Sequence, residues 1–230
     1  MKYDIIETKE RVGADNDRAA QVLRESLREK NIFFINLMAS PGAGKTTLLS
    51  RTIQALQSKY RIGVMEADVD SSVDAETISA LGVKVIQLHS GGLCHMDADM
   101  TARGIDAFDL SDIDILFLEN IGNLVCPAEF DVGSEKRVMI LSVPEGDDEP
   151  LKYPLMFQVS DIVLVNKIDA LPVFDFNKTA FEQNVHLRHP GMPVLYISAK
   201  TGEGFDAWLE WLTDEASRVC KPAENDRKEG

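Results

Sequence analysis

Cysteine is scarce in this chain of 230 residues, which has three: Cys94, Cys126 and Cys220. Three cysteines cannot all pair, and their spacing does not form a disulfide framework, so we expect a reducing compartment. The first ten residues, MKYDIIETKE, also lack the apolar core of a signal peptide. Together these absences predict a cytoplasmic protein. Cys220 lies beside a polar end segment, and we interpret it as a bystander thiol at the end of a helix.

Positive charge is the second shortage. The chain has 24 Lys and Arg against 38 Asp and Glu, which leaves a net charge of −14. Such a charge argues against nucleic acid or an anionic membrane as a partner, and any phosphate ligand must therefore be held locally. No window approaches the roughly 18 uninterrupted apolar residues that a membrane-spanning helix needs. With 44% hydrophobic and 27% charged residues, the composition is that of a globular protein.

Apolar, β-rich runs alternate with helical patterns through most of the sequence. The runs are NIFFINLMA, RIGVMEA, KVIQLH, DILFLEN, RVMILSV, DIVLVNK and PVLYISA. Continuous apolar runs separated by amphipathic segments indicate a mostly parallel sheet that helices bury on both faces. We therefore predict an α/β fold, a single doubly wound domain with a mostly parallel sheet flanked by helices.

The predicted domain occupies residues 31–218, after an N-terminal extension at 1–30 and before a polar C-terminal tail at 219–230. The extension contains the segment DRAAQVLRESLREKN, whose apolar residues recur with helical spacing. We expect an amphipathic helix here that packs on the body of the domain. The side chains that we place on its apolar stripe are Ala19, Val22, Leu23 and Leu27.

A glycine-rich loop follows the first predicted strand. In SPGAGKTTLL, residues 40–49, the glycines let consecutive backbone N–H groups point at phosphate oxygens, Lys45 supplies a positive charge, and Thr46 supplies a hydroxyl for Mg²⁺. The first glycine of the usual P-loop pattern is replaced by Ala39, a mild departure because alanine is small. The residues that we expect to bind the nucleotide's phosphates are Gly42, Ala43, Gly44, Lys45, Thr46 and Thr47.

Two later segments predict which base is bound. VLVNKIDA ends a strand with Asn166, Lys167 and Asp169, and a carboxylate at the last position can accept from both N–H donors on one edge of guanine. YISAKTGEG then supplies Ser198, Ala199 and Lys200, which match the loop that closes over guanine in GTPases. Either segment alone is a weak signal. Both together, in this order after a P-loop, predict a GTP and GDP site.

Carboxylates on the intervening strands suit Mg²⁺, which prefers oxygen ligands, or the positioning of a water. MEADVDSSVDAE places Asp68, Asp70 and Asp74 after the second strand, and FLENIG provides Glu119 three residues before Gly122. We interpret Asp70 as a bystander, and we expect slow turnover because no arginine finger or catalytic glutamine can be identified. The predicted catalytic residues are Lys45, Thr46, Asp68, Asp74 and Glu119, of which Thr46, Asp74 and Glu119 are the magnesium ligands.

A cysteine and a histidine stand side by side in GGLCHMDADM, residues 91–100, as Cys94 and His95. A second thiol, Cys126, follows Glu119 by seven residues on a loop that we expect to move with the nucleotide state. Parallel strands bring both segments to the same edge of the sheet, so Cys94, His95 and Cys126 are predicted ligands of one nickel or zinc site. The alternative is that they are unrelated buried residues, which is common for free cysteines.

Cys94 precedes a predicted helix, and a helix N-terminus would lower the pKa of its thiol and favour the metal-binding thiolate. We interpret Asp97 and Asp99 as acids of the first turn of that helix. Three ligands are one short of a closed four-coordinate site, and a two-fold dimer would supply the remainder. Zn²⁺ as tetrahedral and Ni²⁺ as square-planar both suit thiolate and imidazole, and the choice stays open.

The combination resembles the HypB family, the nickel-incorporation GTPases of nickel–iron hydrogenase maturation. The resemblance is carried, in order, by SPGAGKTTLL, GGLCHMDADM, ENIGNLVCPAEFDVG, EGDDEPLKYPLMF and NKIDALP. It implies a P-loop GTPase of the SIMIBI class, to which signal-recognition GTPases also belong, with a GTP-promoted homodimer that binds metal at its interface through Cys94, His95 and Cys126. It also implies two partners, a HypA-type nickel chaperone and the hydrogenase large-subunit precursor.

The sequence departs from some members of that family. Residues 1–30 contain no Cys and no His, so the N-terminal nickel binding or storage of those members is not expected. Urease-type nickel GTPases are marked by Cys-Pro-His, whereas this chain has Ala128 after Pro127. Two further alternatives remain: a GTP-dependent interaction switch with a structural zinc, and a small-molecule P-loop kinase, which the guanine-reading Asp169 disfavours.

Overall fold

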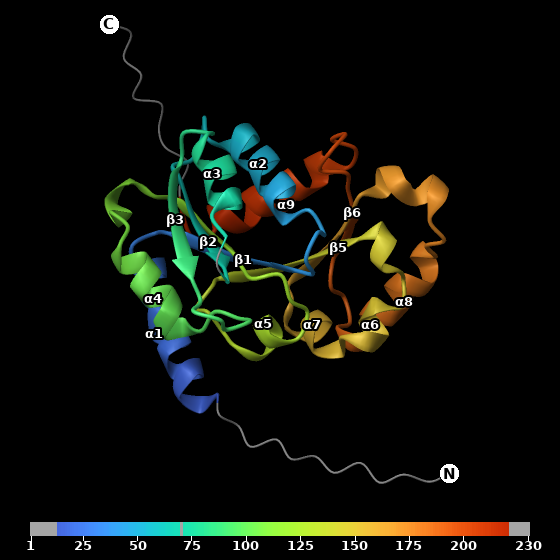
Figure 1. Cartoon of the computed structure of the whole chain (residues 1–230), viewed down its shortest axis with the longest axis horizontal. Helices are drawn as coiled ribbons and strands as arrows, with labels where there is room; N and C mark the ends of the chain where they lie inside the picture. The colour runs from blue at the N-terminus through green and yellow to red at the C-terminus, as the bar shows by residue number, and fades with distance from the viewer. Residues whose placement is uncertain (1–12, 70, 221–230) are drawn as a thin grey trace, which may run out of the picture.

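A single sheet of seven parallel strands organises the chain. The computed structural model describes residues 13–69 and 71–220, and its strands lie in the order β3-β2-β4-β1-β5-β6-β7 (Figure 1). Each predicted apolar run coincides with one strand to within a residue or a few at its ends, and the predicted doubly wound α/β fold is confirmed. The strands are β1 Phe33–Ala39, β2 Ile62–Asp68, β3 Lys84–His89, β4 Ile115–Glu119, β5 Lys136–Ser142, β6 Ile162–Asn166 and β7 Val194–Tyr196.

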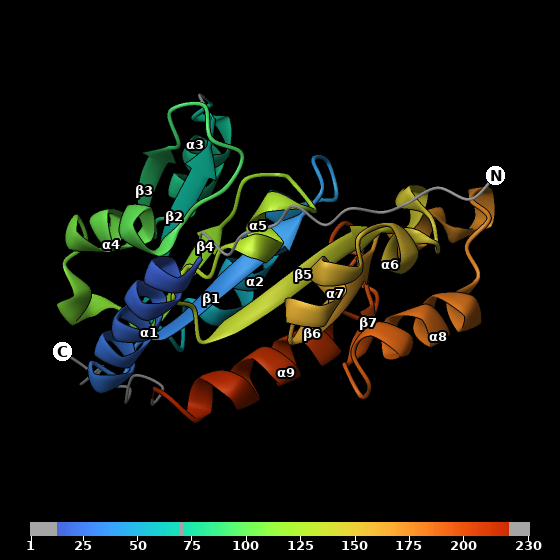
Figure 2. The ribbon, with the colours of Figure 1, turned by 90° about the horizontal axis from the view of Figure 1, so that it is seen from below.

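Helices cover both faces of the sheet. In Figure 1, α2, α3 and α9 lie above the strands, and in Figure 2 the opposite face is crossed by α1, α4, α5 and α7, with α6 and α8 toward one end. The α-helices are α1 Ala14–Glu29, α2 Lys45–Leu56, α3 Val73–Ser79, α4 Ala98–Asp106, α5 Cys126–Glu129, α6 Glu149–Lys152, α7 Pro154–Val159, α8 Lys178–Arg188 and α9 Phe205–Ser217. The short 3-10 helices are η1 Leu110–Asp112, η2 Val143–Glu145 and η3 Ile168–Val173.

The central strand β1 is buried on both faces, which explains why its sequence is a continuous apolar run. Because side chains alternate along a strand, Phe33 and Ile35 point to the core under α2 and α9, whereas Phe34 points to the core under α1 and α4. In the first of these cores, the buried Trp208 of α9 donates from Nε1 to Thr52 Oγ1 of α2 at 2.9 Å. This contact ties the closing helix to the helix that follows the P-loop.

The N-terminal helix α1 is present as predicted, and Leu23 and Leu27 of the predicted stripe pack inward, but Val22 does not. Val22 is 67% exposed, whereas Ala20 and Leu27 are buried. The reason is helical geometry: at about 100° per residue, Ala20 and Leu27 share a face with Asn16, and Val22 points away from it. Asn16 anchors this face by accepting from Ala98 N and donating to Asp131 O, both at 2.9 Å.

The carboxyl ends of the strands meet at one edge of the sheet, where ligands bind in open α/β folds. The P-loop, the end of β4 and the loops that carry the predicted metal ligands all lie there. Asp70, the expected bystander, lies outside the described residues, as do 1–12 and 221–230, so the division into extension, domain and tail stays a prediction. Within 13–69 and 71–220, no helix is long and apolar enough to cross a membrane.

Candidate nucleotide and metal site

The P-loop occupies residues 40–44, between β1 and the first residue of α2, Lys45. Gly42 and Gly44 have φ values of 76° and 97°, in the left-handed region that favours glycine. A side chain at Gly44 is excluded for a second reason, because a Cβ there would lie 2.6 Å from Asn166 Nδ2. The loop therefore presents backbone N–H groups at the N-terminus of a helix, an arrangement that binds phosphate.

Asn166 connects the P-loop to the predicted guanine loop. It is 1% exposed, its Nδ2 donates to Ala43 O at 2.9 Å, and its Oδ1 accepts from Ala199 N at 3.0 Å. Lys167 adds a second link, because its Nζ donates to Gly42 O at 2.6 Å. The structure thus brings the predicted phosphate-binding and base-binding segments together, and both ends of the Asn166 amide are used for it.

The carboxylate of Asp169 is held ready to accept hydrogen bonds. Ser198 Oγ donates to Asp169 Oδ1 at 2.6 Å. This hydrogen bond, with the charges of Lys200 and Lys167, holds the pKa of Asp169 below its usual range. The group is therefore an ionised acceptor at neutral pH, as recognition of the two guanine N–H donors requires.

A small pocket of about 40 Å³ lies beside the P-loop helix. Thr46 Oγ1, in the first turn of α2, donates to Glu119 Oε1 at 2.8 Å, whereas the neighbouring Thr47 is exposed. This volume exceeds the roughly 10–15 Å³ that one water needs. The pocket therefore has room for a small ion with part of its water shell. The charged residues that line it are Lys45, Glu66, Asp68, Asp74 and Glu119.

Glu66 is a pocket residue that sequence reasoning missed. It pairs with Glu119 in the register of β2 against β4, and each of the two is 3% exposed. Burial and then the neighbouring charge of Glu119 raise the pKa of Glu66, and burial also raises the pKa of Glu119, against the opposing charge of Lys45. The available signal was an acid inside the otherwise apolar run RIGVMEA, in a strand that is buried on both faces.

The donor set of this pocket fits Mg²⁺. Glu66 Oε1 and Glu119 Oε2 are buried and have no hydrogen-bond partner within the described part of the chain. Buried carboxylate oxygens without a partner are costly, and they are typical of sites that complete their contacts with a ligand or an ion. The pocket therefore offers carboxylate and hydroxyl oxygens, the ligand type that Mg²⁺ prefers.

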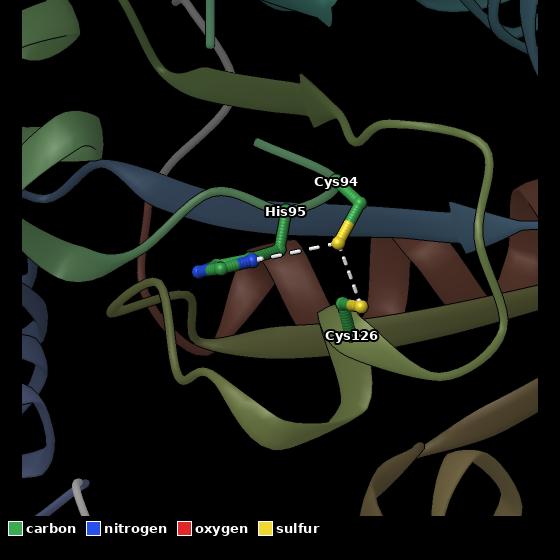
Figure 3. A group of neighbouring side chains, drawn as sticks. All are labelled: Cys94, His95 and Cys126. Atoms are coloured by element: carbon green, nitrogen blue, oxygen red, sulfur yellow. Dashed lines mark hydrogen bonds between the residues drawn. The ribbon is translucent and has the colours of Figure 1, made fainter. Parts of the chain in front are cut away.

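The three predicted ligands of the transition-metal site lie together. The Sγ atoms of Cys94 and Cys126 are 2.8 Å apart, and Cys94 Sγ lies 4.0 Å from His95 Nδ1 (Figure 3). One ligand atom from each residue lies within 4.8 Å of the others. Two thiols and an imidazole at these separations form a donor set for nickel or zinc.

The expected position of Cys94 at a helix N-terminus is wrong. Helix α4 begins only at Ala98, and Asp97 is its N-cap, with a carboxylate that accepts from Met100 N at 2.8 Å. Cys94 instead lies in the loop before this cap, outside the helix. Asp97 and Asp99 serve the helix rather than the metal, as interpreted from the sequence, since Asp99 is in the first turn.

Two side chains hold the predicted metal ligands in place. Asn123 Oδ1 accepts from Val125 N at 2.8 Å and from Cys126 N at 3.3 Å, which fixes the start of α5. The His95 ring stacks on Phe130, with centroids 3.8 Å apart and planes 11° from parallel. Burial lowers the pKa of His95, and a hydrogen bond with the Cys94 thiol raises the pKa of Cys126. Neither Asn123 nor Phe130 was predicted from the sequence.

Residues 33–195 match the family described as CobW/HypB/UreG, nucleotide-binding domain. The chain belongs to this family. Within it, the chain belongs with the HypB proteins: it is 44% identical to hydrogenase maturation factor HypB of Azotobacter chroococcum over 86% of its own length and 65% of that protein, so it spans somewhat less than two thirds of that relative.

A more fully covered HypB relative is the probable hydrogenase maturation factor HypB of Methanocaldococcus jannaschii, with 36% identity over 89% of this chain and 92% of that protein. Among solved structures, HypB from Helicobacter pylori in complex with nickel is similar, with a TM-score of 0.85 and 30% identity, covering 92% of this chain and 100% of that one. The HypB fold therefore extends over nearly all of the chain.

The third thiol of this HypB-family chain lies apart from the site. Cys220 follows α9, is 2% exposed, and donates from Sγ to Ala216 O at 3.4 Å. It packs in the core under α2 and α9, with Tyr60. Its position past the end of a helix agrees with the sequence interpretation.

Proposed function

We propose that this chain is a GTP-hydrolysing metallochaperone that binds nickel or zinc at a switch-linked site in a dimer interface and assists nickel insertion into the nickel–iron hydrogenase precursor. The observation that carries the proposal is the short segment from Glu119 to Cys126, which joins the pocket beside the P-loop to the ligand cluster. The membership in the HypB family supports the hydrogenase assignment.

In this proposal Lys45 and the P-loop N–H groups hold the phosphates, and Asp169 selects guanine. Thr46, Asp74 and Glu119 would hold Mg²⁺, which would supply positive charge against the phosphates of the nucleotide. Asp68, at the end of β2, lines the same pocket and positions water. Intrinsic turnover is slow, because the described residues around the pocket include no arginine.

The coupling between the two sites follows from close packing. Asn123 N donates to Ala39 O at 2.9 Å, and a Cβ on Gly122 would lie 3.1 Å from Pro41 of the P-loop. A γ-phosphate that shifts the P-loop or Gly122 therefore shifts Cys126, four residues on. GTP and GDP then favour two arrangements of the metal ligands, which is a population shift biased by the γ-phosphate.

A second copy of the chain completes the metal site. Cys94, His95 and Cys126 are one ligand short of a closed four-coordinate site, and a two-fold dimer supplies the remainder. Leu93 is 48% exposed and Val125 is 51% exposed, so apolar side chains flank both cysteines, which suits an interface. GTP promotes this homodimer, and hydrolysis releases the metal toward its partners, a HypA-type nickel chaperone and the hydrogenase large-subunit precursor, in the cytoplasm.

Calorimetric titration of the purified chain with Ni²⁺ tests the coupling, once with GDP and once with a non-hydrolysable GTP analogue. We expect different affinities and stoichiometries, and a dimer with the analogue by light scattering. Cys94→Ser and Cys126→Ser should each weaken binding, whereas Cys220→Ser, the matched control away from the site, should not. Identical nickel binding in both nucleotide states would show that the switch is not coupled to the metal.

A second function, a GTP-dependent interaction switch with a permanent structural zinc, is favoured by the separation of the ligand atoms, because two thiols and an imidazole within 4.8 Å of one another also suit zinc. An exchange assay separates the two: a closed zinc site resists replacement by nickel in every nucleotide state. Comparing GTP with ATP binding tests the kinase alternative, and incubation with a urease precursor tests a urease-type role.

A further inference from the structure

We propose that Glu66 is a further residue of the magnesium–nucleotide site, where its Oε1 accepts a hydrogen bond from water bound to Mg²⁺ and its charge stabilises the ion. This inference rests on the proposed GTP site and adds to it a residue from a second strand. Glu66 acts through water rather than on the phosphate, so it is a positioning residue.

The first argument is its place in the sheet. Glu66 lies two residues before the end of β2, at a position that is buried like its apolar neighbours in the strand. The register with β4 sets it directly beside Glu119, which accepts from Thr46 Oγ1. Two adjacent buried carboxyl groups repel when ionised and are costly to bury. A divalent cation beside them offsets both costs.

The second argument is the unused hydrogen-bonding capacity. Glu66 lines the pocket of about 40 Å³, and its Oε1 has no hydrogen-bond partner in the described ranges, 13–69 and 71–220. Mg²⁺ in nucleotide sites keeps several of its waters, and those waters need acceptors. Groups that hold metal-bound waters or ligands change metal affinity by about 10- to 100-fold when they are replaced.

The test is Glu66→Gln, which keeps the shape and one acceptor oxygen but removes the charge. The control is Glu76→Gln, an exposed acid in the first turn of α3 that loses the same charge outside the pocket. Binding of a fluorescent GDP analogue is measured in EDTA and across a Mg²⁺ series. Mn²⁺ bound to the nucleotide complex is counted by electron paramagnetic resonance, so the readout does not depend on turnover.

We expect the Mg²⁺ concentration at half-effect to rise about tenfold in Glu66→Gln and to stay unchanged in Glu76→Gln, with equal nucleotide binding in EDTA for both variants. Thermal unfolding without Mg²⁺ should show Glu66→Gln about as stable as the unaltered chain, because burial and the charge of Glu119 raise the pKa of Glu66 to about 10, so a neutral carboxyl group is replaced by a neutral amide. An unchanged Mg²⁺ dependence overturns the proposal.

The same measurements separate this inference from the proposed function. If the unaltered chain binds no guanine nucleotide with or without Mg²⁺, the GTP site itself is wrong. If Glu66→Gln unfolds, Glu66→Asp replaces it, since the shorter carboxylate keeps the charge but retracts it from the pocket. If Glu66→Gln and Glu66→Asp both lose nucleotide binding in EDTA, Glu66 has a structural role, and the proposal is overturned.

Discussion

At the scale of single residues, the three thiols differ in their surroundings. Cys94 is exposed and Cys126 half-buried, beside each other at the sheet edge, whereas Cys220 is in the core. Burial raises the pKa of Cys220 to about 11, and the thiolate is the reactive form of cysteine. Cys94 and Cys126 should therefore react with thiol reagents in the native chain, whereas Cys220 should be protected.

We expect a thiol reagent such as Ellman's reagent to release two equivalents of chromophore rapidly from the native, metal-free chain. In the native chain Cys220 should react roughly a hundredfold more slowly than the other two thiols, because it is buried and protonated. The third equivalent should therefore appear only when the chain unfolds. Absorbance in buffer and in denaturant measures both phases. Cys220→Ser should retain the rapid phase and lose the slow one. Three rapid equivalents in the unaltered chain would contradict the structure.

The ligands also predict how nickel binding depends on pH. Burial lowers the pKa of His95, so its imidazole is neutral at pH 7 and needs no deprotonation, whereas the raised pKa of Cys126 means that its thiol must lose a proton. Nickel affinity should therefore keep rising between pH 7 and 8.5 instead of levelling off near the usual imidazole pKa of about 6.5.

Calorimetry in buffers of different ionisation enthalpy counts the protons released. Because the pKa of Cys126 is raised, we expect nickel binding at pH 7 to release about one proton fewer in Cys126→Ser than in the unaltered chain. If nickel affinity does not change above pH 7, deprotonation of the His95 imidazole, and not of the thiol, determines the pH dependence. The chain with Cys220→Ser serves as the control with an unaltered ligand set.

At the scale of elements, helix α1 is joined to the segment that follows the candidate metal ligand Cys126. Asp131 Oδ2 accepts from Arg24 Nη2 at 2.6 Å and from Arg137 Nη2 at 2.7 Å, and all three side chains are at most 26% exposed. Arg24 Nε also donates to Ser134 O at 2.8 Å. The carboxylate of Asp131 thus connects α1 to β5, immediately after the segment that carries Cys126 and Phe130.

Replacing this carboxylate should loosen α1. For Asp131→Ala we expect a loss of about 1–3 kcal/mol in the free energy of unfolding, because two partly buried arginines lose their acceptor. Denaturant unfolding followed by circular dichroism measures it. The control is Asp15→Ala, which breaks the exposed pair Arg18–Asp15, and its midpoint should not move. Equal effects of both variants would contradict the argument.

Elements also show where sequence reasoning reached its limit. The strands and the P-loop were predictable because apolar runs and glycine spacing are local signals. The pairing of Glu66 with Glu119 was not, because β4 lies between β1 and β2 in the sheet and the sequence of β2 carries no trace of its neighbour. Val22 was wrongly expected on the inward face of α1, because only apolar residues were considered. The polar Asn16, which contacts Ala98, marks the true inward face.

At the scale of the whole molecule, the P-loop and the loop after β4 are closely packed against each other. A Cβ on Gly122 would meet Pro41 Cα, N and Cγ at 3.1 Å each, and much of that contact is backbone. Its neighbour Asn123 both donates to Ala39 O and holds the start of α5. In the proposed mechanism, this contact is where a movement of the P-loop would be passed to the segment that carries Cys126.

Gly122→Ala should uncouple the metal site from the nucleotide site without unfolding the chain. The added methyl group displaces the P-loop by a few tenths of an ångström, so we expect weaker GTP-analogue binding and a nickel affinity that no longer differs between nucleotide states. Gly13→Ala is the matched control, because a Cβ there meets nothing within 4 Å. Calorimetry with both ligands on both variants measures the coupling, and a full nickel response in Gly122→Ala would contradict this route.

The bond between Trp208 and Thr52 has a practical consequence. The chain has two tryptophans, and both are on α9, stacked with centroids 5.6 Å apart. Thr52 belongs to α2, the helix that begins at the P-loop, so this indole pair is a built-in optical probe of that helix. A movement of α2 against α9 would change the surroundings of the Trp208 indole and so its emission, and nucleotide binding can therefore be tested in real time without an added label.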